Sequence, residues 1–134
     1  MLQFTKEADY GLQLVLALTK MSPGQLLSLK KFSQDSNISF LFLQRIAKKL
    51  REAGIIRANK GARGGYGLSP DWPEFSLRQV MESVEGSCAI MDCLRPGCAC
   101  KRCHKETCVA RKIFGEINQR WLALLSQMKL KELI

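Results

Sequence analysis

Residues 28–54 read SLKKFSQDSNISFLFLQRIAKKLREAG, and the rest of the predicted fold can be built outward from them. Ser28 can cap a short helix over residues 29–35, and Ser39 can cap a longer helix that stops at Gly54. The longer helix has one apolar face, formed by Leu43, Ile46, Ala47 and Leu50 at helical spacing. Its other face is polar and basic, with Gln44, Arg45, Lys48, Lys49 and Arg51. Two helices with a tight connection and a basic outer face favour a helix-turn-helix.

The next residues, 55–68, read IIRANKGARGGYGL and predict a β-hairpin. Strands are expected at 55–59 and 66–68, and the glycine-rich tip between them carries Lys60 and Arg63. A cation on a thin tip can enter the minor groove of DNA. A nucleotide phosphate loop is disfavoured, because no Gly-Lys-Ser/Thr is present and no helix follows directly. A helix-turn-helix followed by a basic hairpin predicts a winged helix.

Three further helices are expected. The first spans Thr5 to Lys20, another runs from the cap Ser76 through Glu85, and a long helix begins near Thr107. The apolar seam of the long helix favours dimerisation, and the alternative is a helix folded back on its own domain. The seam comprises Ala110, Ile113, Phe114, Ile117, Trp121, Leu124, Leu125 and Met128. The predicted fold class is mainly α with a small β-hairpin: a winged helix-turn-helix domain (1–86), a cysteine-rich loop (87–107) and a dimerisation helix with a C-terminal tail (108–134).

The charge balance favours a polyanionic partner. The 134 residues include 21 Lys plus Arg against 12 Asp plus Glu, a formal charge of +9. Double-stranded DNA is the simplest such partner, and an anionic membrane surface is the lesser alternative. No apolar run is long enough to span a membrane and no signal-peptide pattern precedes the fold, so a cytoplasmic protein is expected.

All six cysteines lie between Cys88 and Cys108. In a reducing compartment, clustered thiols indicate metal binding or redox sensing more often than a disulfide scaffold. Neighbouring lysines and arginines favour the thiolate, which is the form that binds metal and reacts. Cys88, at the apolar end of the preceding helix, is expected to be a buried, inert thiol. The remaining segment is therefore interpreted as a soft-metal site.

Several motifs, in order, now resemble a known family: FTKEADYGLQLVLAL, the helix-turn-helix segment, KGARGGYGLS, FSLRQVMESVEG, CVARKIF and KLKELI. They are similar to the IscR and NsrR family of bacterial winged-helix transcription regulators, the Rrf2 family, and look most like its IscR type. The resemblance implies homodimers that bind palindromic promoter DNA. It also implies three loop cysteines that hold an iron–sulfur cluster, with 2Fe–2S favoured and 4Fe–4S allowed by the extra thiols.

Family ligands carry over by position. Cys93, followed by Leu94, and Cys108, followed by Val-Ala-Arg, match the first and third cysteine ligands. Cys103 is the expected middle ligand, with Cys100 and then Cys98 as alternates. Where one branch of the family has a histidine ligand, this chain has Arg111. The candidates for the fourth ligand are therefore His104, the single histidine, and Asp9, which matches an aspartate that the partner subunit supplies in another branch.

DNA contacts carry over in the same way. Ser39 matches a base-contacting residue, and Gln44 stands where some members have a base-reading glutamate. Lys60 matches a wing arginine that enters the minor groove. Arg45 and Lys48 on the recognition helix and Arg63 on the wing tip are the further DNA-binding candidates, and Leu41 replaces a residue that is often polar.

The sequence thus predicts an iron–sulfur-responsive transcription regulator of cluster-assembly or stress genes, which cluster-donating proteins would supply. Two alternatives keep DNA binding and change the sensor, to thiol oxidation or to zinc. A cluster-carrying redox protein is a lesser alternative, because the cysteine spacing fits no ferredoxin pattern. No convincing acid–base pair is present, so an enzyme is not expected.

Overall fold

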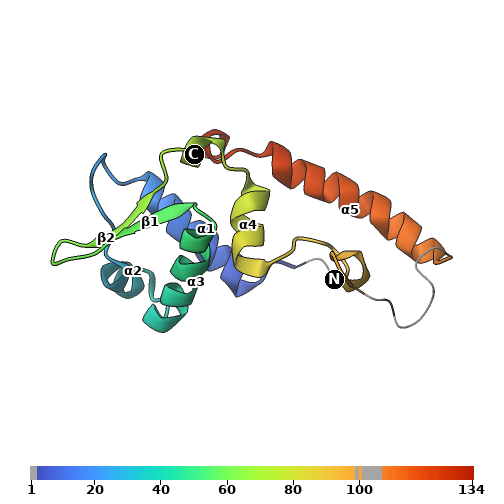
Figure 1. Ribbon diagram of the computed structural model, residues 1–134, viewed down its shortest axis with the longest axis horizontal. Helices are drawn as coiled ribbons and strands as arrows, with labels where there is room; N and C mark the ends of the chain where they lie inside the picture. Colours follow the sequence, from blue (N-terminus) through green and yellow to red (C-terminus); the bar gives the residue numbers. More distant parts are fainter. Residues whose placement is uncertain (1–2, 99, 101–106) are drawn as a thin grey trace.

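The computed structural model describes residues 3–98, 100 and 107–134, and its element order confirms the predicted fold class (Figure 1). The helices are α1 (Lys6–Thr19), α2 (Leu29–Ser36), α3 (Phe40–Glu52), α4 (Leu77–Glu85) and α5 (Val109–Gln127). The strands are β1 (Ile56–Asn59) and β2 (Gly65–Leu68), and the short 3-10 helices are η1 (Trp72–Glu74), η2 (Asp92–Leu94) and η3 (Leu130–Glu132).

Helix starts lie where the sequence places caps. The Thr5, Ser28 and Ser39 side chains each accept a hydrogen bond from a backbone N–H of the first turn of α1, α2 and α3. Ser76 does the same for α4 and, with Gln79, forms a capping box. These bonds satisfy backbone donors that have no partner inside a helix. The boundaries of the helix-turn-helix therefore follow from local sequence.

The main core lies where α3 packs against α1 and α4. All four residues of the predicted apolar face of α3 are buried there. Leu14, Val15 and Leu18 contribute from α1, and Val80 and Val84 from α4. Gly11 on α1 allows close packing, because a Cβ atom there would lie 3.1 Å from a methyl carbon of Val84. This core fixes the outward face of α3.

The wing is an antiparallel pair, with Ile56 opposite Leu68 and Asn59 opposite Gly65. Leu27 forms an isolated antiparallel bridge with Tyr66 of β2. Its N–H donates to Tyr66 O (2.8 Å) and its carbonyl accepts from Tyr66 N (2.9 Å). A Cβ atom on Gly65 would lie 2.6 Å from Leu27 O, so this approach requires glycine. The segment before α2 thereby holds the base of the wing.

The C-terminal half of helix α5 packs on the helical body, and η2 contacts its N-terminal half at Gly115. Leu125 is buried in a second apolar cluster with Ala8, Met81 and Cys88, and the Trp121 indole N–H donates to Cys88 O at 3.0 Å. The N-terminal half of α5 extends away from the helical body, toward the end opposite the wing (Figure 1).

The chain then returns to the main core. Leu130 is fully buried in that core, and its N–H donates to Phe75 O at 2.9 Å. Ser76 and Lys129 form an antiparallel bridge beside it. The domain boundaries at residues 86 and 107 remain a prediction, but the C-terminal tail packs with the first of those units.

Candidate DNA-binding surface and cysteine loop

The recognition helix α3 presents a narrow outward stripe. Leu41, Gln44, Arg45 and Lys48 are all exposed and recur at i, i+3, i+4 and i+7, opposite the buried face. Ser39 is also exposed, but its side-chain oxygen accepts a hydrogen bond from Phe42 N at 3.4 Å. The structure therefore brings these sequence-predicted candidates to one surface, while their roles in DNA binding stay predictions.

Glu7 of α1 binds two cations of α3. Its carboxylate accepts from Lys49 Nζ at 2.8 Å and from Arg45 Nη2 at 3.2 Å. The hydrogen bond from Lys49 is the main cause that lowers the pKa of Glu7. Lys49 Nζ also donates to Val84 O at 2.9 Å, so one ammonium joins α1, α3 and the end of α4. This role of Glu7 was not predicted from the sequence, because nothing local marks a partner 42 residues away.

Arg45 is held from a second side as well. Its guanidinium carbon lies 5.4 Å from the centre of the Phe42 ring, within the range of a cation–π contact. Phe42 in turn packs edge-on against Tyr10 of α1. Arg45 is thus partly engaged by its own protein, whereas Gln44 and Lys48 make no side-chain hydrogen bond or ion pair among the described residues.

The wing tip carries the predicted cations. Lys60 and Arg63 are exposed and make no ion pair among the residues that the structure describes. Gly61 has a φ of 126°, and a Cβ atom on Gly64 would lie 2.5 Å from Asn59 O. The tip is therefore a narrow glycine turn that leaves both cations free to meet a polyanion.

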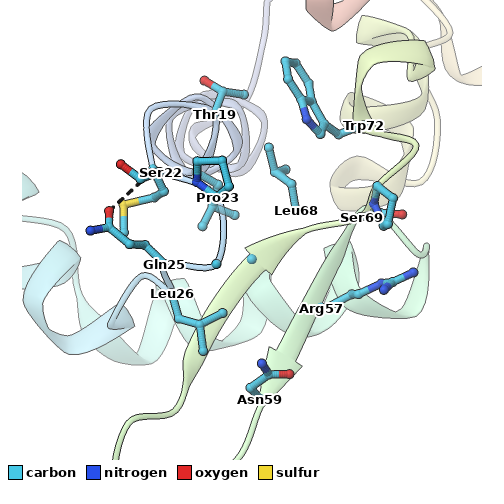
Figure 2. Close-up of a pocket in the computed structure, with 15 residues that line it drawn as sticks. Thr19, Ser22, Pro23, Gln25, Leu26, Arg57, Asn59, Leu68, Ser69 and Trp72 are labelled. Atoms are coloured by element: carbon cyan, nitrogen blue, oxygen red, sulfur yellow. Dashed lines mark hydrogen bonds between the residues drawn. The ribbon is translucent and has the colours of Figure 1, made fainter.

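A surface hollow of about 680 Å³ lies beside the wing (Figure 2). The turn after α1 forms one wall with Pro23 and Leu26, and the start of η1 forms another with Trp72. Leu68 points into this space from β2. Arg57 and Asn59 line the hollow from β1. Trp72 and Leu68 also pack against the main core, so the hollow is shaped by core residues.

Cys88 is separate from the rest of the cysteine loop. It is buried in the second apolar cluster, as expected, although α4 already ends at Glu85. Burial raises the pKa of the Cys88 thiol to about 11, and the nearby carboxylates of Glu82 and Glu85 add to the shift. This thiol is therefore protonated at neutral pH.

The other described thiols are half-buried at the surface. Cys93 lies on η2, Cys98 and Cys100 follow it, and Cys108 caps α5 by accepting from Arg111 N at 3.4 Å. Leu94 of η2 packs over Gly115 of α5. Two candidate ligands thus lie on elements that contact each other.

The remaining candidate ligands are not assembled with them. Cys103 and His104 lie outside the described residues. Asp9 is exposed on α1 and accepts from Gln13 Nε2 at 2.9 Å. In the described ranges, no group of three or more His, Cys, Asp or Glu side chains is placed to hold a metal ion. The ligand set therefore stays a prediction.

Arg111, in the first turn of α5, is a further feature beside the loop. Its Nε is buried and has no hydrogen-bond acceptor within the part of the chain that the structure describes. A buried donor without an acceptor is costly, so an electron-rich group beside the first turn of α5 would be stabilised there. Thiolates and inorganic sulfide are such groups, and this donor set fits a cluster bound by thiols.

Comparison with known proteins identifies the family. Residues 4–134 match the Rrf2 family, described as iron-dependent transcriptional regulators. The chain belongs to the Rrf2 family. These proteins are DNA-binding transcription regulators, and the winged helix described above is their fold.

The similar proteins carry three different regulator names: NsrR, IscR and CymR. NsrR of Bacillus subtilis is 24% identical over 99% of this chain and 90% of its own length. IscR of Photorhabdus laumondii is 25% identical over 99% of this chain and 79% of its own length. The oxidised form of Staphylococcus aureus CymR is 26% identical, with a TM-score of 0.74 over 98% of this chain and 94% of that one.

The solvent-exposed face of α5 carries an apolar stripe. Ile113 is 58% exposed and Ile117 is 49% exposed, and Val109, Phe114 and Leu124 are also open to solvent. The predicted seam is therefore split, since Leu125 and Trp121 cover the protein's own second cluster. No helix of the described chain is long and apolar enough to cross a bilayer.

Proposed function

We propose that this protein is a homodimeric, cytoplasmic regulator that binds palindromic promoter DNA and senses iron–sulfur supply through its cysteine loop. The observation that carries the proposal is the position of the loop. It connects the end of α4, which Lys49 of α3 contacts, to the start of α5. A change in the loop can therefore act on both the DNA-binding surface and the long helix.

The DNA-binding part of the proposal rests on one end of the molecule. Ser39, Gln44, Arg45 and Lys48 are the candidates on α3, with Lys60 and Arg63 on the wing. Cations on the wing would contact phosphates or the minor groove, and polar side chains on α3 would read base edges in the major groove.

The dimer part rests on the apolar stripe of α5. Exposing five large apolar side chains on one helix is unfavourable in water unless another surface covers them. A second copy offers the same stripe, so a two-fold pair would bury both. This pairing would leave the two wings at opposite ends, as a palindromic site requires.

The cluster part rests on the donor set. Cys93, Cys108 and Cys103 would hold the cluster, Cys100 and Cys98 are alternates, and His104 or the partner's Asp9 would complete it. When bound, an iron–sulfur cluster supplies thiolate-ligated iron whose charge and integrity respond to oxidants and iron supply. A 2Fe–2S cluster is favoured, and the extra thiols also suit 4Fe–4S.

The chain's own residues would transmit the change. Bringing the sulfurs of Cys93 and Cys108 together ties η2 to the first turn of α5. Arg95, two residues after Cys93, shares a surface hollow with Glu7 and Glu85. Glu7 holds Arg45 and Lys49 of the recognition helix. Loop binding can alter DNA affinity only if it favours one arrangement of these contacts over another.

The test is an anaerobic visible absorption and circular dichroism spectrum of freshly purified protein, with iron and sulfide counted on the same sample. Visible bands with matching iron and sulfide are expected. Cys93→Ala and Cys108→Ala should lose both signals and remain folded, and Cys88→Ala is the control that should keep them. A colourless sample after attempted reconstitution would overturn the cluster and leave DNA binding to be tested separately.

A thiol-redox regulator is the second candidate, and the likeness to the oxidised form of CymR favours it. In that case the half-buried loop thiols would be oxidised to sulfenic acid or disulfide without metal. Zinc bound by the same thiols is a variant of this candidate, and metal analysis of the colourless sample separates the two.

A further inference from the structure

Leu41 is the most exposed large apolar side chain in the described part of the chain, at 70%. A single exposed leucine is ordinary on a protein surface. This one, however, lies in the first turn of α3, between the N-cap Ser39 and Gln44. The first residues of a recognition helix are those that reach base edges. Its surroundings therefore determine what it can contact.

The geometry of α3 places Leu41 in the polar stripe and not in the core. Leu41, Gln44 and Lys48 share one side of the helix, and Leu43, Ile46 and Leu50 are buried on the other. Phe40, the first residue of α3, is 41% exposed and lies at the edge of this stripe, one turn before Gln44. Of the two apolar side chains exposed in the first turn, Leu41 is the more open to solvent, and it lies in the stripe beside the amide of Gln44.

Arg45 does not cover this point. Its guanidinium is bound by Glu7 at 3.2 Å and lies against the Phe42 ring. Apart from Phe40 at the edge of the stripe, the side chains left facing outward in the first turns of α3 are therefore Leu41 and Gln44.

We propose that Leu41 recognises the C5-methyl group of a thymine in the major groove, next to an adenine read by Gln44. The methyl group of thymine is the apolar feature of the major-groove edge, and an amide side chain pairs with N6 and N7 of adenine. Residues three apart on a helix are separated by about 4.5 Å along its axis. That separation is close to the spacing of neighbouring base pairs, about 3.4 Å.

This inference rests on the proposed function, because it requires α3 to lie in the major groove. It goes further by naming the base and the atom. It also predicts that the preferred half-site contains adjacent A·T pairs, which neither cysteine chemistry nor net charge would specify.

The experiment begins with selection of binding sites from a random duplex library by the purified protein. Each thymine of the selected site is then replaced singly by deoxyuridine, which lacks only the methyl group, and Kd is measured by fluorescence anisotropy at fixed salt. Loss of one buried methyl should weaken binding about fourfold, which corresponds to about 0.8 kcal/mol. Replacement in both half-sites should weaken binding about 16-fold.

Variants identify the side chain responsible. Leu41→Ala should fold, because the residue is exposed and alanine favours helix, and it should bind thymine and deoxyuridine sites equally. Leu133→Ala, an exposed leucine on the C-terminal tail, should keep the full thymine preference.

Two results would overturn the inference while leaving DNA binding intact: no thymine that responds to deoxyuridine, or an unchanged response in Leu41→Ala. Failure to enrich any sequence over the starting library would instead refute the proposed sequence-specific DNA binding, and the role of Leu41 with it.

Discussion

Replacing Leu130 by alanine tests the packing of the C-terminal tail against the DNA-binding core. Leu130 is 0% exposed and lies in the same cluster as the buried faces of α1, α3 and α4. The change removes three carbon groups, worth about 0.8 kcal/mol each, or about 2.4 kcal/mol in all. The cavity that remains adds to this cost, so the free energy of unfolding should fall by about 3 to 4 kcal/mol.

Leu133 supplies the matched control, because it lies three residues further along the same tail and is 41% exposed. Leu133→Ala should change the free energy of unfolding by no more than about 0.5 kcal/mol. The assay is urea unfolding followed by far-UV circular dichroism. It should be repeated at several protein concentrations, because the proposed dimerisation would make apparent stability depend on concentration.

A Leu130→Ala protein within about 1 kcal/mol of the wild type, or no less stable than Leu133→Ala, would refute the packing described here. It would mean that the tail, and with it the end of α5, is not anchored in the core. An altered m-value would show that the variant exposes a different amount of surface on unfolding.

Three other predictions address charge, thiol chemistry and assembly. Glu7→Gln should release the two cations that its carboxylate holds, so DNA affinity should rise and the slope of log K against log salt should steepen by about 0.9 for each further phosphate that these cations neutralise. Glu52→Gln, an equal charge change at a residue with no ion pair among those described, should leave the slope unchanged. An equal effect of both variants would contradict a specific role of the Glu7 ion pairs. Cys88 should react with iodoacetamide at pH 8 about 100-fold more slowly than an ordinary thiol, because its pKa is about 11 in place of 9; mass mapping that finds it among the first modified would count against its burial. Ile117→Asp should yield monomers in sedimentation, whereas Gln119→Asp on another side of α5 should not; dimers in both would place the interface elsewhere.

Local sequence rules accounted for the helix-turn-helix and the wing. Helix α3 begins after the N-cap Ser39 and ends before Gly54, which has a φ of 76°. Both signals act on the neighbouring backbone alone. The glycine-rich tip followed from turn chemistry in the same way. Such features depend on residues a few positions apart, so they can be read without knowing the fold.

The contacts that join distant segments could not be read in this way. Three such contacts join residues that are far apart in sequence: the hydrogen bond between Lys49 and Glu7, the backbone bridge between Leu27 and Tyr66, and the packing of Leu130 in the main core. None of these residues has a local pattern that differs from an ordinary surface or loop residue.

The seam of α5 was read correctly as apolar, but its division was not foreseen. Periodicity identifies which residues share a face, and it does not say which neighbour covers them. Trp121 and Leu125 are covered by the protein's own α1 and α4, whereas Ile113 and Ile117 are not. The candidate cluster ligands pose the same problem, since spacing alone cannot bring Cys93 and Cys108 to one point.

Helix α5 is anchored by the buried Leu125 near its C-terminal end, whereas Val109 at its other end is 68% exposed, so the helix has the proportions of a lever. From Val109 to the buried Leu125 the arm is about 24 Å long at 1.5 Å per residue. A shift of about 2 Å at its free end, where the cysteine loop joins, corresponds to a rotation of only about 5° at the held end. In the proposed dimer, such a lever would convert a displacement at the start of α5 into a small change in the angle between the two recognition helices, which must match a fixed half-site spacing.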